Sequence, residues 1–187
     1  MPGKWTHGVP WKWTIAVRHF TPTVDSVTDT PNTPTEQRTP TTPRLDLPVL
    51  VPDVHRAMLR LHEAARRDLD PALVELVLIR ASQINRCAFC VDMHTRDARR
   101  AGEREERIHL LTAWEEAGDL YTGRERAALA LTEAVTVLTD GFVPDGVYRR
   151  AAERFEEEEL ARLVSLIATI NTWNRLNVTA RTPPAGE

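Results

Sequence analysis

The fold is decided by residues 71–94, which read Pro-Ala-Leu-Val-Glu-Leu-Val-Leu-Ile-Arg-Ala-Ser-Gln-Ile-Asn-Arg-Cys-Ala-Phe-Cys-Val-Asp-Met-His. Asp70 followed by Pro71 is typical of a helix N-cap and first helical position, so a helix is predicted over residues 71–84. The pattern then breaks, and a second helix is predicted over residues 87–101 before a glycine. Apolar residues of the first helix recur at the spacing of one helical face: Val74, Val77, Leu78 and Ala81.

Helical patterns fill most of the chain beyond residue 45, and no alternating strand pattern occurs there. Thr122 and Glu125 have the spacing of a capping box, which predicts the start of a helix. We therefore predict an all-α single domain over residues 45–184, a bundle of six or seven helices. The other predicted helices cover residues 52–69, 103–117, 123–138, 144–155 and 156–177.

Residues 1–44 differ in composition, with seven of the thirteen prolines and eleven threonines. Such a sequence cannot sustain a helix, so we predict a Pro/Thr-rich disordered extension. An over-long assignment of the start would explain the same composition. A third interpretation is that the extension docks onto a partner subunit through its aromatic rings, Trp5, Trp11 and Trp13.

Charge and hydropathy exclude several classes of protein. The net charge of −3 and the sequence pI of about 6.1 indicate no basic face for nucleic acid. No apolar run approaches the roughly 20 residues of a membrane helix, and the N-terminus lacks the apolar segment of a secretory signal. We therefore expect a cytoplasmic protein with no nucleic acid or membrane partner. Its two cysteines lie close together, which in a reducing compartment is more typical of chemistry than of structural disulfides.

Cys87, Cys90 and His94 have the spacing that brings three side chains to one face of a helix. An imidazole one turn from a thiol can accept its proton, and the thiolate is the reactive form. Because Cys90 is the cysteine one turn from His94, we predict that Cys90 attacks and that Cys87 captures the resulting sulfenic acid as a disulfide. We expect the open start of the helix to leave Cys87 accessible to a reductant.

Glu75 is a lone carboxylate in an otherwise apolar run of the preceding helix. If the two helices fold back on each other, Glu75 can reach His94 directly or through water and orient the imidazole. An exposed helix glutamate explains the same pattern equally well. The pattern alone leaves both interpretations open.

The arrangement Glu75-x11-Cys87-x-x-Cys90-x-x-x-His94 resembles the core motif of the alkylhydroperoxidase D and carboxymuconolactone decarboxylase superfamily. The segment 170–177, Ile-Asn-Thr-Trp-Asn-Arg-Leu-Asn, is similar to the closing helix of that family. The resemblance spans residues 44–184.

This resemblance implies an oxidoreductase, a thiol-dependent peroxidase without a cofactor, whose substrates are a hydroperoxide and a dithiol or protein reductant. It implies that Cys90 attacks the peroxide, that Cys87 donates a proton and forms the disulfide, and that Glu75 and His94 form a proton relay. It also implies an all-helical fold and a homo-oligomer, commonly a trimer or hexamer. The chain departs from alkylhydroperoxidase D at Phe89, where that protein has a second histidine. The decarboxylase branch lacks the cysteine pair, so decarboxylation is disfavoured.

Two other functions stay open. Zinc could bind Cys87, Cys90 and His94, with Glu75 or water as the fourth ligand, although structural zinc sites usually use two separated ligand pairs. A non-catalytic redox-sensing or oligomerisation module would form the disulfide without turnover.

The remaining polar residues of the predicted helices have simpler interpretations. We expect surface or interface positions for three histidines, His55, His62 and His109. Asn171 and Asn174 lie in an apolar helix and require hydrogen-bond partners, which could lie across a subunit contact.

Overall fold

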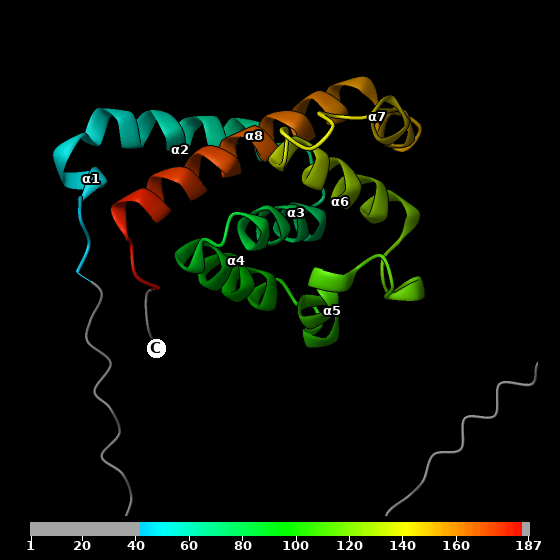
Figure 1. Ribbon diagram of the computed structural model, residues 1–187, viewed down its shortest axis with the longest axis horizontal. Coiled ribbons are helices and arrows are strands. Elements are labelled where there is room, and N and C mark those ends of the chain that lie inside the picture. The colour runs from blue at the N-terminus through cyan, green and yellow to red at the C-terminus, as the bar shows by residue number, and fades with distance from the viewer. Residues whose placement is uncertain (1–41, 185–187) are drawn as a thin grey trace, which may run out of the picture. The chain divides into compact units, whose positions relative to one another are not determined.

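A computed structural model describes residues 42–184, which form an all-α domain with no strand in that range (Figure 1). The predicted fold class is confirmed. The extension predicted over residues 1–44 lies outside the described residues except for its last three. None of the helices in residues 42–184 has both the length and the apolar character needed to cross a membrane. The helices are α1 (Leu47–Leu50), α2 (Pro52–Arg66), α3 (Pro71–Ile84), α4 (Ala88–Arg100), α5 (Glu105–Leu110), α6 (Gly123–Thr136), α7 (Asp145–Ala152) and α8 (Glu157–Ala180), with 3-10 turns at Leu111–Ala113 and Gly118–Leu120.

The central helix of the domain is α3, which packs against α4, α6 and α8 (Figure 1). Its apolar run is buried on every side, and a helix that is apolar all round needs a partner on each face. One face, which includes Val74 and Leu78, packs in a core with α2, α6, α7 and α8. The opposite face, which includes Leu76 and Ile79, packs with α4, α5 and the 3-10 turn that follows α5.

Most of the helix ends follow the sequence signals. The Asp70 carboxylate accepts a hydrogen bond from the backbone N–H of Leu73 at 2.9 Å, which caps α3. Thr122 and Glu125 form the predicted capping box of α6. α2 ends at Arg66, before the predicted residue 69, because Arg67 leaves the helical conformation with ψ 139° and Asp68 follows in a left-handed conformation with φ 62°. The short α1 raises the number of described helices to eight, where six or seven were predicted.

The helix predicted over residues 103–117 is wrong in its second half. α5 ends at Leu110, and turns follow in place of a continuing helix. Arg126 supplies partners for backbone carbonyls in this segment, donating to the Trp114 oxygen at 3.0 Å and to the Glu115 oxygen at 3.1 Å. Because the guanidinium satisfies these carbonyls, the chain can leave the helix and turn Trp114 into the core.

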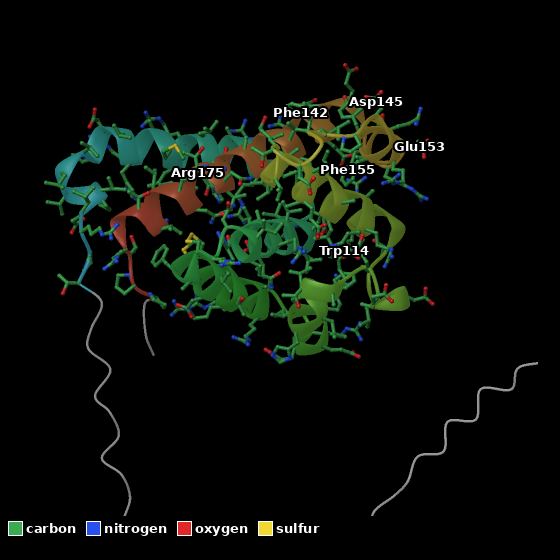
Figure 2. All side chains as sticks on the ribbon, in the orientation of Figure 1. Trp114, Phe142, Asp145, Glu153, Phe155 and Arg175 are labelled. Carbon is green, nitrogen blue, oxygen red and sulfur yellow. A yellow bond between two sulfur atoms is a disulfide. The ribbon has the colours of Figure 1, made fainter. Side chains whose placement is uncertain are left out.

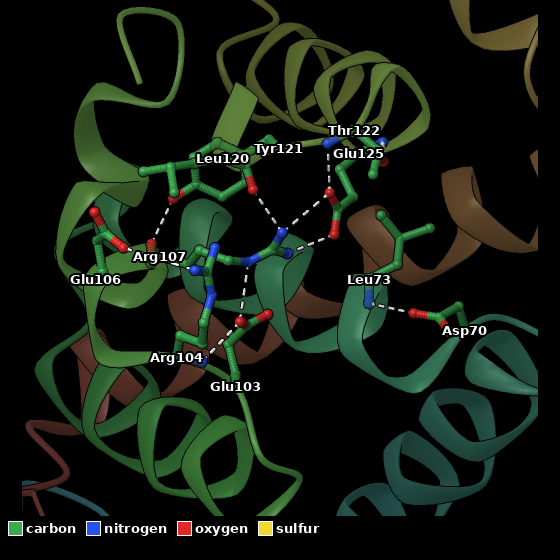
Figure 3. A network of polar contacts seen from close by, with 10 residues as sticks. All are labelled: Asp70, Leu73, Glu103, Arg104, Glu106, Arg107, Leu120, Tyr121, Thr122 and Glu125. Carbon is green, nitrogen blue, oxygen red and sulfur yellow. Dashed lines mark hydrogen bonds and ion pairs between the residues drawn. The ribbon is translucent and has the colours of Figure 1, made fainter. Parts of the chain in front are cut away.

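A cluster of charged side chains joins α5 to the start of α6 (Figure 3). Arg107 Nη2 lies 2.5 Å from Glu125 Oε1, and Arg107 Nε lies 2.9 Å from Glu103 Oε1. Arg107 Nη1 also donates to the Leu120 carbonyl at 2.6 Å. The Tyr121 hydroxyl donates to the Arg107 carbonyl, and burial raises the pKa of Tyr121 to about 12. These contacts hold the irregular segment between the two helices.

Side-chain amides hold the turn between α3 and α4 against α8. Asn85 Nδ2 donates to Asn171 Oδ1 at 2.9 Å and to Asn174 Oδ1 at 3.0 Å. Asn174 Nδ2 donates to Ser82 Oγ, and Asn171 Nδ2 to Thr136 Oγ1, both at 3.0 Å. The partners of Asn171 and Asn174 therefore lie within the chain, and this network fixes the turn that precedes the cysteines.

Candidate active site

The turn between α3 and α4 sets the direction of the cysteine pair. Arg86 takes a left-handed conformation with φ 55°, which ends α3 and redirects the chain. The Cys87 N–H donates to the Ser82 carbonyl at 3.0 Å. Cys87 is the N-cap of α4, and its sulfur accepts a hydrogen bond from the Cys90 N–H at 3.4 Å. The sulfur of Cys87 therefore lies at the helix N-terminus, where the helix dipole favours negative charge.

The structure joins Cys87 and Cys90 as a disulfide with a Cα–Cα separation of 5.4 Å, and Figure 2 shows it as a yellow bond at the start of α4. Each cysteine is only 1% exposed. The expectation that Cys87 is open to an external reductant is therefore wrong for this chain. The physical reason is that its side chain turns back to cap the helix. Of the two cysteines, Cys90 lines a cavity.

Glu75 and His94 are in direct contact between α3 and α4. His94 Nδ1 lies 3.0 Å from Glu75 Oε2, and both side chains are buried. The exposed position that the pattern allowed for Glu75 is therefore wrong, because α3 is covered on all sides. A buried carboxylate accepts a hydrogen bond from Nδ1–H, which leaves Nε2 of His94 free to accept a proton. Arg66 Nη2 lies 3.7 Å from Glu75 Oε1 and further offsets the charge.

The cavity beside these residues has a volume of about 380 Å³ and lies between α2, α4 and α8. Its polar lining residues include Cys90 and His94, so the two residues border the same space. Its size falls in the range of small-molecule sites, which are commonly apolar with a few polar groups. The apolar lining includes Leu59, Phe89, Met93, Ile170 and Trp173.

Among the polar residues at this cavity that were not predicted as functional, Asn177 and His62 lie beside the site, and His55 also lines the cavity. Asn177 Nδ2 lies 3.7 Å from Cys90 Sγ as a donor, and it also donates to the Trp173 carbonyl at 3.0 Å. His62 was expected at the surface or an interface, but it lines the cavity and its ring stacks on that of His94. The sequence indicates part of this position, because His55, Leu59 and His62 recur at the spacing of one helical face.

No group of three or more His, Cys, Asp or Glu side chains within residues 42–184 is arranged to hold a metal ion. His94 Nδ1 is instead directed at Glu75. The arrangement supports proton transfer between a thiol, an imidazole and a carboxylate.

The family of this chain follows from its similarity to known proteins. Residues 52–134 match the sequence profile of the carboxymuconolactone decarboxylase family. The uncharacterized protein YdfG of Bacillus subtilis is 50% identical over 104 residues, which are 56% of this chain and 70% of that protein. The chain therefore belongs to the carboxymuconolactone decarboxylase/AhpD-like superfamily.

Two further similarities agree with this assignment. The uncharacterized protein YnjA of Escherichia coli is 33% identical over 125 residues, which are 66% of this chain and 67% of that protein. The crystal structure of ATU0492 from Agrobacterium tumefaciens, described as a protein of unknown function and a candidate antioxidant defence protein AhpD, superposes with a TM-score of 0.75. It is 34% identical and covers 78% of this chain and 99% of its own.

Proposed function

We propose that this protein is a thiol-dependent peroxidase that reduces hydroperoxides through Cys90 and Cys87. The observation that carries the proposal is that Cys90 and His94 face one cavity while Glu75 holds the other ring nitrogen of His94. A nucleophile, a base and a group that orients the base are thus brought together.

In the first step, His94 Nε2 takes the proton of the reduced Cys90 thiol. The thiolate attacks the terminal oxygen of the hydroperoxide, the O–O bond breaks, and its electrons leave on the alkoxide. The alkoxide takes the proton from His94 and departs as an alcohol, while Cys90 becomes a sulfenic acid. Glu75 stabilises the transient imidazolium, and Asn177 donates a hydrogen bond toward the sulfur.

In the second step, the Cys87 thiol attacks the sulfenic sulfur of Cys90, which releases water and forms the disulfide. A dithiol or protein reductant then restores both thiols and is itself oxidised to a disulfide. Because Cys90 lines the cavity and Cys87 does not, we propose that the reductant attacks the Cys90 sulfur through the cavity.

The apolar lining supports an organic hydroperoxide with an apolar group as the substrate, since the aliphatic and aromatic side chains exclude water from around the O–O bond. We place the reaction in the cytoplasm, where dithiol reductants are present. We also propose a homo-oligomer, a trimer or hexamer. Exposed apolar side chains on α1 and α2 support it: Val49, Leu50, Val54 and Leu61.

The proposal is tested by steady-state consumption of cumene hydroperoxide with dithiothreitol as the reductant. We expect sustained turnover by the wild type and none above background by Cys90→Ser. A single equivalent of peroxide consumed, with disulfide formation and no turnover, would instead indicate a redox sensor. Stoichiometric zinc, with thiols that react only after chelation, would indicate a metal site.

A further inference from the structure

Two imidazoles besides that of His94 line the cavity, those of His55 and His62, and the ring of His62 lies beside the relay. The rings of His62 on α2 and His94 on α4 are stacked, with their centroids 6.4 Å apart and their planes at 22°. Both rings line the cavity with Cys90. A stacked pair offers no hydrogen bond from ring to ring, so His62 does not act by passing protons to His94 directly.

Hydrogen bonding within residues 42–184 does not account for the ring nitrogen Nδ1 of His62. Its Nδ1 is buried and has no hydrogen-bond partner among residues 42–184. Buried polar atoms in folded proteins are nearly always hydrogen-bonded, and an exception calls for a physical explanation, of which a catalytic role is one. The cavity that this ring lines also has polar side chains of Asp46, His55, Asn177 and Thr182, and His62 is placed among them by its stacking on His94.

The charged groups around His62 and His94 differ, and so do the roles of the two imidazoles. Burial lowers the pKa of His62, and a proton on His94 and the charge of Arg66 lower it further, while Glu63 and Glu75 act in the opposite direction. These groups face His62 from α2, α3 and α4. Glu75 contacts His94 directly, and it acts on His62 only from a distance. His62 therefore stays neutral and keeps a ring nitrogen that can accept a hydrogen bond.

We propose that His62 is a further catalytic residue, a neutral imidazole that accepts a hydrogen bond from the O–H of the bound hydroperoxide and directs its terminal oxygen at Cys90. This inference rests on the proposed peroxidase function. The hydroxyl group keeps its proton as it passes to the sulfur to give the sulfenic acid. The alkoxide receives its proton from His94, so His62 ends the step unchanged.

The test uses the full chain with Cys87→Ser, reduced beforehand, so that Cys90 reacts once. Two rate constants are measured for each variant: oxidation of Cys90 by cumene hydroperoxide and alkylation of Cys90 by iodoacetamide across pH. His62→Phe keeps an aromatic ring for stacking and removes the acceptor. We expect oxidation to slow by about tenfold or more, as for loss of a positioning contact. The alkylation profile, which reports the thiolate, should be unchanged.

Two further variants complete the test. His62→Gln restores an acceptor and should recover part of the oxidation rate, and it serves as the informative variant if His62→Phe fails to fold. His109→Phe, at an exposed position on α5, is the matched control and should oxidise at the wild-type rate. The inference is overturned if His62→Phe and His62→Gln oxidise at that rate, or if oxidation and alkylation fall together. If the wild-type chain does not react with peroxide, the proposed peroxidase function is overturned as well. The wild-type rate therefore distinguishes failure of the peroxidase proposal from failure of the inference about His62 alone.

Discussion

His94 Nδ1 and Glu75 Oε2 lie 3.0 Å apart in the interior, and this contact links the helix that carries the cysteines to the central helix of the domain. A histidine held in this way has a defined tautomer, with Nε2 as the proton acceptor. The contact turns two residues that are 19 positions apart in the chain into one unit.

Glu75→Gln is expected to weaken the relay while it keeps the shape of the side chain. The neutral amide cannot stabilise an imidazolium, so the pKa of Cys90 should rise relative to the wild type and peroxide consumption should fall by about a hundredfold. The pH profile of Cys90 alkylation in the Cys87→Ser background measures the first effect. Glu106→Gln, at an exposed site on α5, is the control. An unchanged profile in Glu75→Gln would remove Glu75 from the relay.

Asn177→Ala is expected to remove the donor that lies 3.7 Å from Cys90 Sγ. Because a hydrogen bond to the charged form favours that form, the thiolate should be less populated and alkylation near neutral pH should slow by a few fold, about the effect of one weak hydrogen bond. Asn177→Asp should slow it further, since a carboxylate repels the thiolate. Thr179→Ala on the exposed side of α8 should react as the wild type does. Equal rates in all four proteins would show that the contact has no effect.

His62 makes the stability of the domain depend on pH. Its pKa in the folded state is lowered below 6.5, so below that pH the unfolded chain binds more protons than the folded one. Stability should therefore fall as the pH drops below 6.5, and His62→Phe should lose part of this dependence. Thermal melts of both proteins between pH 7.5 and pH 5 measure it. A variant whose melting temperature follows the same pH curve as the wild type would contradict the prediction.

Arg107→Met is expected to destabilise the domain by about 3 kcal/mol, because it leaves two largely buried carboxylates without their partner. Arg104→Met removes a guanidinium of the same helix region that lies in solvent beside Glu106, and it should change stability by less than about 1 kcal/mol. Urea denaturation of the two variants gives the comparison. If the two losses were alike, the cluster of Figure 3 would not hold the segment.

The fold was largely predictable because its signals are local. The apolar run of α3, its Asp70 cap and the capping box at Thr122 depend on neighbours within a few residues. The turns after α5 were not predictable from local sequence, because Arg126 donates to their carbonyls from a later helix.

Some residues of the candidate site were also predictable from local spacing, and others depend on the packing of distant helices. Cys87, Cys90 and His94 lie at the N-cap and in the first two turns of α4, so spacing alone associates them. Glu75 could not be assigned from its pattern, because its burial depends on every face of α3 being covered. His62 and Asn177 come to the cavity from α2 and α8, and only the packing of those helices against α4 brings them to the sulfur.

In the proposed mechanism, Cys90 attacks the hydroperoxide and Cys87 does not. The most direct measurement is mass spectrometry of the reduced Cys87→Ser protein after one equivalent of cumene hydroperoxide and a sulfenic acid trap. We predict one trapped adduct on Cys90, and no adduct on Cys87 in the matching Cys90→Ser protein. An adduct on Cys87 in Cys90→Ser, with Cys90 unmodified in Cys87→Ser, would contradict the account.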